Sequence, residues 1–112
     1  MTALTLRVAD TFFARLRGVH AGGPLAEDEA MLIRPCRAIH TFFLSYSLDV
    51  VFLDAHGRVC RSVECLPPGR MVFERGAFMV VELPAGYCAS HPDYPARIHA
   101  ALRLRESPRL SL

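Results

Sequence analysis

The stretch HTFFLSYSLDVVFLDAHG, residues 40–57, decides the fold, because it sets one acidic residue, Asp49, inside a dense apolar run. Residues 38–44 and 48–54 are rich in β-branched and aromatic side chains, which favour strands. We expect two strands joined by the tight Ser-Tyr-Ser connection between them. A carboxylate in these surroundings is costly unless it is paired, hydrogen-bonded or solvated. Asp49 therefore has either a structural partner or a functional role.

Short strands and turn residues are predicted on both sides of this stretch. Asp10 and Thr11 are suited to cap a short helix that ends at Gly18. The C-terminal segment 91–105 fits a helix capped by Asp93 and running to about Leu102, which we favour, or a final strand. Strands are expected at residues 4–8, 30–35, 58–66 and 76–84, where alternation or apolar runs end at Gly or Pro. The pattern predicts an α+β fold that is mostly antiparallel β, with one or two short helices.

Length and composition predict one globular domain over residues 1–106, followed by a loose tail at 107–112. Of the 112 residues, 52% are apolar and 21% charged, which is typical of a globular protein. The net charge is only +2 and no basic stripe occurs, so we expect no nucleic-acid partner. All thirteen basic residues are Arg, which excludes a lysine Schiff base or a phosphate-loop lysine.

The N-terminal residues MTALTLRVAD lack the charged and apolar regions of a secretory signal. A run of about 18 apolar residues, as a membrane-spanning helix needs, is also missing. We therefore expect a cytoplasmic protein without membrane insertion. Its four cysteines should then be reduced.

Metal binding and covalent catalysis both have weak support in the sequence. Cys36 with His40 and Cys88 with His91 would make a Cys2His2 set for zinc. On a strand, however, the first pair would lie about 13 Å apart. Cysteine or serine nucleophiles beside these histidines lack an elbow or oxyanion signature. We predict no metal and no cofactor.

Three carboxylates, Asp49, Asp54 and Glu82, stand in strand-like apolar surroundings. If their strands are neighbours, two of them could share a site and have separated pKa values, as acid–base pairs do. The alternative is that each caps a turn or pairs with an Arg. Asp54, before His-Gly, fits a turn. Glu82 fits an ion pair with Arg34, Arg37 or Arg58, and for Asp49 a structural hydrogen-bonding role is slightly favoured.

The aromatic residues beside Asp49 offer a binding surface. Successive residues of a strand face opposite sides, so Phe42 and Phe43 cannot both enter one core. One of them lines a groove or an exposed patch, unless both faces of the strand are buried.

Taken together, RLRG at 15–18, AMLI at 30–33, IHTFFLSYSLDVVFLDAHGRV at 39–59 and VELPAG at 81–86 resemble the domain-of-unknown-function family 192. The resemblance covers roughly residues 5–90. It implies a small α+β domain with a mostly antiparallel, barrel-like sheet, and it carries no established activity. The family pattern falls on Met31, Leu32, His40, Thr41, Asp49, Phe52, Asp54, Gly57, Glu82 and Gly86. The chain departs from it at Leu44, where Met is usual, and at Ser47, where Pro is usual.

The preferred hypothesis is a non-catalytic binding or accessory domain, whose polar–aromatic groove holds a small polar ligand or a peptide segment. A second hypothesis is a small hydrolase or isomerase with Asp49 or Glu82 as general base and His40 as partner. Burial of Asp49 against backbone amides alone would remove it from that role. A third is a protein-interaction module for a larger assembly. The candidate ligand-binding residues are His40, Thr41, Phe43, Asp49, Asp54 and Glu82.

Overall fold

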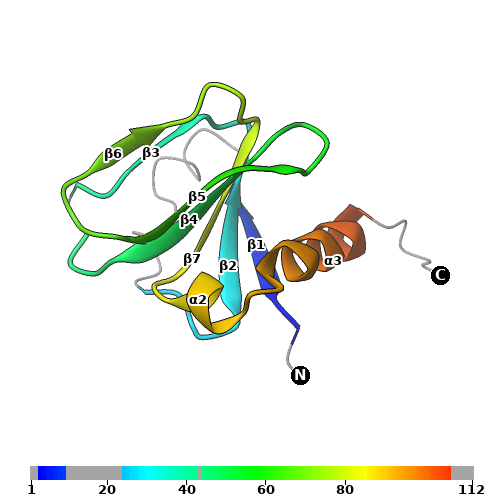
Figure 1. Cartoon of the computed structure of the whole chain (residues 1–112). Helices are drawn as coiled ribbons and strands as arrows, with labels where there is room; N and C mark the ends of the chain where they lie inside the picture. The colour runs from blue at the N-terminus through cyan, green and yellow to red at the C-terminus, as the bar shows by residue number, and fades with distance from the viewer. Residues whose placement is uncertain (1–2, 10–23, 43, 107–112) are drawn as a thin grey trace.

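A five-stranded sheet forms the centre of the computed structural model, which describes residues 3–9, 24–42 and 44–106 (Figure 1). Two further strands pair in a second sheet, and two described helices follow the last strand. Across the large sheet the order is β1 (Thr5–Ala9), β2 (Glu29–Ile33), β7 (Met79–Pro84), β4 (Leu48–Leu53) and β5 (Val59–Leu66). The small sheet pairs β3 (Ala38–His40) with β6 (Met71–Phe73), and the helices are α2 (Tyr87–Ser90) and α3 (Tyr94–Glu106).

Both faces of the large sheet are covered, which explains why every residue of β4 is buried. On one face Val51, Leu53 and Val81 pack with Ile98 of α3. On the other, apolar side chains including Phe52 pack with residues of β3 and β6. In Figure 1, α3 and the small sheet accordingly lie on different sides of the large sheet.

The predicted α+β class, rich in antiparallel strands, is confirmed. β1 and β2 are parallel, and the other paired strands are antiparallel. The expected barrel is not confirmed, because the described strands form an open sheet with β1 and β5 at its edges.

The predicted pairing of residues 38–44 with 48–54 through the Ser-Tyr-Ser connection is wrong. The first segment is a strand only over β3, which pairs with β6, whereas β4 pairs with β5 and β7. The reason is Thr41, a buried residue whose amide donates to the Arg70 carbonyl at 2.8 Å. This bond holds the chain beside the 67–70 loop, away from β4.

At the C-terminal end the helix prediction is confirmed, and α3 runs four residues beyond Leu102. The Asp93 carbonyl accepts the amides of Ala96 and Arg97 at its start. The Asp93 carboxylate instead binds Arg97 Nε at 3.0 Å. The predicted helix ending at Gly18 falls within residues 10–23, outside the described residues. No helix in the described part of the chain has the length and apolar character to cross a membrane.

Candidate functional site

Asp49 lies opposite a β-bulge of the neighbouring strand. Leu48 pairs with Leu66 and Val50 with Val63, so two residues of β5 face one residue of β4. Within the bulge Cys65 has a φ of 52°, in the left-handed region. The amide of Cys65 donates to Asp49 Oδ1 at 2.8 Å.

The same carboxylate also binds the first turn of α2. Gly86, the N-cap residue, donates its amide to Oδ1 at 3.0 Å, and Cys88 donates to Oδ2 at 2.9 Å. Amides at a helix start have no partner within the helix, so a carboxylate is a suitable acceptor. Asp49 is fully buried, with 0% exposure. A carboxylate so enclosed joins three chain segments and is shielded from solvent.

Burial is the main cause that raises the pKa of the Cys88 thiol to about 12, and the charge of Asp49 adds to it. The thiol is therefore protonated at neutral pH, in contrast to a reactive or metal-binding cysteine. His91 stacks on Tyr87 with 4.1 Å between ring centroids. Cys36 Sγ donates to the Ala38 carbonyl at 2.9 Å. The described residues include no group of three or more His, Cys, Asp or Glu placed to hold a metal ion.

Glu82 lies on the opposite face of the sheet from Asp49. Its register partners are Met31 and Val50, while Asp49 pairs with Leu83. Neighbouring strands therefore bring the two carboxylates close in register, but the pleat directs them to opposite faces. The two do not share an acid–base site.

The Glu82 side chain is 3% exposed, and no described residue hydrogen-bonds its Oε1 atom. Burial raises its pKa from 4.5 to about 7. The expected ion pair with an arginine does not occur within the described part of the chain. Tyr46 packs on the same core, and its buried hydroxyl also lacks a partner among the described residues. The tyrosine pKa is raised by burial and then by the charge of Glu82, which indicates that the two groups are near each other.

Thr41, also fully buried, fastens the 67–70 loop. Its hydroxyl donates to the Pro67 carbonyl at 2.6 Å and accepts the Arg70 amide at 2.9 Å. The Gly69 amide donates to the Thr41 carbonyl at 2.9 Å. Thr41 therefore fixes the entry to β6 and presents no polar atom to a ligand.

His40, in contrast, is exposed on the outer face of the small sheet. It pairs with Met71, and its ring stacks on Phe42 at 5.0 Å. Two positions along the register Phe73 pairs with Ala38, so this pair lies on the same face of the small sheet as His40 and Met71. Met71 is 63% and Phe73 59% exposed. We call His40, Phe42, Met71 and Phe73 the β3–β6 face.

Met71 and Phe73 are functional candidates that the sequence analysis missed. The sequence signal was the short apolar run Met-Val-Phe between Arg70 and Glu74. In the structure only its middle residue, Val72, packs on the core. Phe42, at 39% exposure, fits the expectation that one of the two adjacent phenylalanines is exposed. Phe43 lies outside the described residues.

Asp54 is a turn residue, as the sequence suggested. Its Oδ1 accepts the amides of His56 and Arg58 at 2.8 and 2.9 Å. These bonds, with that of Arg58 first, lower the pKa of the carboxyl. The carboxylate thereby fixes the β4–β5 turn beside a cavity. Of the residues that line this cavity, only Gly57 belongs to the family pattern.

Known proteins that are similar to this chain include a relative in sequence and two solved structures. A "UPF0127 protein" of Thermococcus sibiricus is 34% identical over 86 residues, which are 72% of this chain and 55% of that protein. The chain thus spans little more than half of that relative's length. A protein of unknown function from Novosphingobium aromaticivorans has a similar fold, with a TM-score of 0.69 at 19% identity. The similarity covers 78% of this chain and 67% of that one.

A putative transcription regulator from Sinorhizobium meliloti is equally similar in fold, with a TM-score of 0.69 at 22% identity over 78% of this chain and 73% of the other. At these identities the two structures support the fold alone. The model of the family DUF192, described as "Uncharacterized ACR", matches residues 1–92. The chain belongs to this family.

Proposed function

We propose that this is a non-catalytic binding domain that holds a segment of a protein partner on the β3–β6 face. The observation that carries the proposal is the exposure of large apolar side chains. Five large apolar side chains are exposed among the described residues. Four of them lie within one segment of the chain, between positions 42 and 78: Phe42, Met71, Phe73 and Phe78. Contiguous exposed apolar surface is typical of interaction sites.

Charged residues around the β3–β6 face suggest the chemistry of the partner. Arg37 and Arg70 adjoin its two strands, and Arg75 follows β6; all three are exposed. Glu74 is the one acidic residue within β3, β6 and their immediate neighbours. We therefore expect a partner segment with apolar side chains flanked by carboxylates, since Arg pairs with carboxylates and stacks on aromatic rings.

A peptide-display selection on the immobilised domain tests this proposal. We expect the enriched peptides to share apolar residues with acidic neighbours. Their affinity should be lost when Met71 and Phe73 are both changed to Ser. Leu104→Ser is the matched control, because Leu104 is 72% exposed on α3. Failure to enrich peptides, or peptides that bind the double variant equally well, would overturn the proposal.

A second candidate function rests on Glu82 as the general base of a small enzyme. A buried carboxylate with a pKa near 7 is suited to take up a proton at neutral pH. This role requires that small molecules reach the side chain. Treatment of the native protein with a carbodiimide and an amine, read by mass spectrometry, checks for that access. Modification of Glu82 but not of Asp49 supports the role, and protection of both contradicts it.

A further inference from the structure

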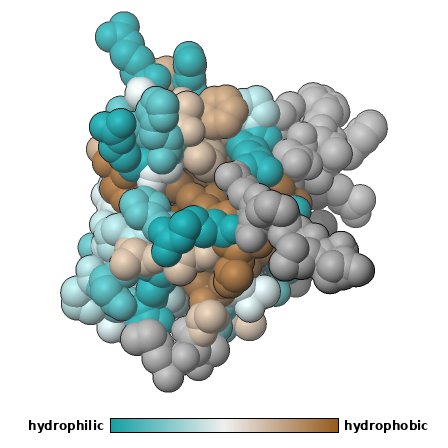
Figure 2. All heavy atoms as spheres, turned by 90° about the vertical axis from the view of Figure 1, so that its right-hand side faces the viewer, coloured by the Kyte–Doolittle hydropathy of each residue, from teal (hydrophilic) through white to brown (hydrophobic). Residues whose placement is uncertain are grey.

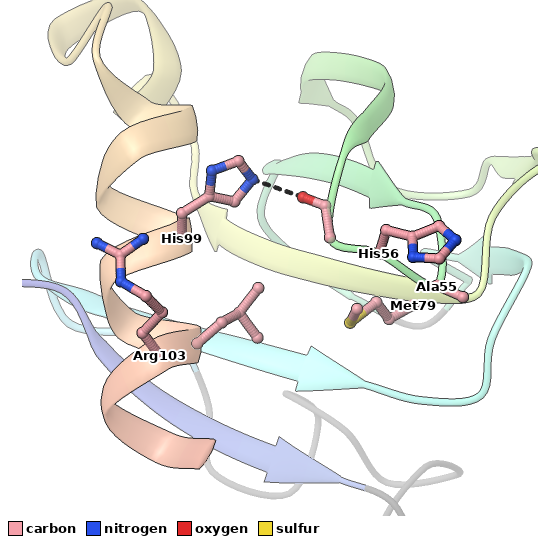
Figure 3. Close-up of a pocket in the computed structure, with 7 residues that line it drawn as sticks. Ala55, His56, Met79, His99 and Arg103 are labelled. Atoms are coloured by element: carbon pink, nitrogen blue, oxygen red, sulfur yellow. Dashed lines mark hydrogen bonds between the residues drawn. The ribbon is translucent and has the colours of Figure 1, made fainter. Parts of the chain in front are cut away.

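A cavity of about 300 Å³ opens between the β4–β5 turn and α3 (Figure 3). α3 lies on a different side of the large sheet from the β3–β6 face (Figure 1). Its volume is at the lower end of the range for small-ligand sites. Met79 and Leu102, 6% and 9% exposed, supply an apolar floor. Figure 2 views this side of the molecule and shows hydrophobic atoms gathered at its centre, with hydrophilic atoms around them.

Three side chains with nitrogen donors line the cavity, and one of them, the guanidinium of Arg103, is cationic. His56 extends from the β4–β5 turn, and His99 and Arg103 lie one helical turn apart on α3 (Figure 3). None of the described residues that line the cavity carries a carboxylate. The adjacent Asp54 is engaged by the backbone amides of the turn.

His99 has its two ring nitrogens in different roles. Nε2 lies 2.6 Å from the Gly57 carbonyl oxygen, which can only accept, so Nε2 carries the hydrogen. This bond ties the turn to α3 and closes one side of the cavity. Nδ1 is not used in that bond. His99 is held at the wall of the cavity by the bond of Nε2.

We propose that this cavity binds a small organic anion, a carboxylate or a phosphate monoester. Its apolar part rests on Met79 and Leu102, and its oxygens face the guanidinium of Arg103. The planar guanidinium matches either oxyanion through two parallel hydrogen bonds. The apolar floor distinguishes such a ligand from an inorganic ion. The cavity and the β3–β6 face share no residue, so this proposal stands apart from the proposed function.

NMR titration of the ¹⁵N-labelled protein tests the site with benzoate, phenyl phosphate, inorganic phosphate and benzyl alcohol. We expect saturable shifts of the Gly57, His99 and Leu102 amides with benzoate or phenyl phosphate. Benzyl alcohol and inorganic phosphate should bind roughly tenfold more weakly or not at all, a difference of about 1.4 kcal/mol. If benzyl alcohol binds as tightly as benzoate, the charge of the ligand has no role. If inorganic phosphate binds as tightly as phenyl phosphate, the apolar floor has no role.

Variants on α3 locate the charge that the ligand meets. Arg103→Gln should weaken binding of the organic anion by about tenfold or more. Arg105→Gln is the matched control, since Arg105 is also exposed on the same helix but is not among the residues that line the cavity. The proposal fails if neither anion gives saturable shifts. It also fails if the two variants bind alike.

Discussion

Asp49 and Glu82 lie on adjacent strands, one register position apart, and face opposite sides of the sheet. The first carboxylate accepts three backbone amides, whereas within the described residues nothing hydrogen-bonds Oε1 of the second. Two acids of similar burial therefore have opposite effects on stability. Replacing each by its amide should separate these effects.

Asp49→Asn should lower the free energy of unfolding by about 2–4 kcal/mol, because at least one buried amide then meets an NH₂ group instead of a carboxylate oxygen. The corresponding fall in Tm is roughly 10 °C. Urea and thermal unfolding followed by circular dichroism measure both. Asp93→Asn, which changes an exposed carboxylate paired with Arg97, is the control and should cost much less. Equal losses in the two variants would contradict the structural role of Asp49.

Glu82 should make the protein less stable as the pH rises from about 4.5 to 7. Its pKa is raised in the folded state, so the folded protein holds the proton over this range while the unfolded chain releases it. The stabilisation is complete below the unfolded pKa of 4.5 and is lost as the pH passes through about 7. The loss is on the order of 3 kcal/mol.

Urea unfolding at several pH values, compared between wild type and Glu82→Gln, isolates this contribution from the titration of the histidines. The variant cannot titrate at this position, so its stability should change less over the same interval. Parallel pH profiles for the two proteins would show that Glu82 is ionised in the fold as readily as in the unfolded chain.

Thr41→Val should release the 67–70 loop. The change keeps the side-chain shape but removes the hydroxyl that contacts Pro67 and Arg70, at a cost of about 1–3 kcal/mol. Hydrogen exchange measured by NMR should become faster at the amides of Gly69 and Arg70. Thr41→Ser retains the hydroxyl and should leave both exchange rates close to those of the wild type. Faster exchange in the serine variant, with unchanged exchange in the valine variant, would implicate packing of the methyl group instead.

Cys88 should resist alkylation in the folded protein. Its thiol is 3% exposed and its pKa is raised to about 12, so little thiolate forms at mildly alkaline pH. Cys65, which is exposed, provides the internal comparison. Peptide mass spectrometry after iodoacetamide treatment should find Cys65 modified and Cys88 modified only after denaturation. Early labelling of Cys88 in the native protein would contradict the buried placement.

The sequence was sufficient to predict the strands whose apolar residues form long runs, because both faces of β4 and β7 are buried. It was also sufficient for the turn at Asp54, whose short-range hydrogen bonds reach only as far as Arg58. The partner of β3 could not be predicted. It depends on bonds between Thr41 and residues 26–29 positions later, and the Ser-Tyr-Ser connection suggested a closer pairing.

The candidate site was harder to predict than the fold for a similar reason. The three donors to Asp49 are main-chain amides. Every residue except proline has such an amide, so the residue types do not reveal these donors. In the sequence, His99 and Arg103 have no feature that sets them apart from other helical residues. They line a cavity only because the β4–β5 turn packs against α3. Both sets of contacts are non-local, so residue spacing contains little information about them.

The position of the amides around Asp49 also constrains the order of folding. A β4–β5 hairpin formed alone can offer this carboxylate one of its three donors, the amide of Cys65. The other two come from residues 37 and 39 positions farther along the chain. The hairpin register therefore gains its full stabilisation only when β7 and α2 have docked. Because such distant contacts are slow to form, we expect the bulge to be among the last elements of the sheet to become rigid.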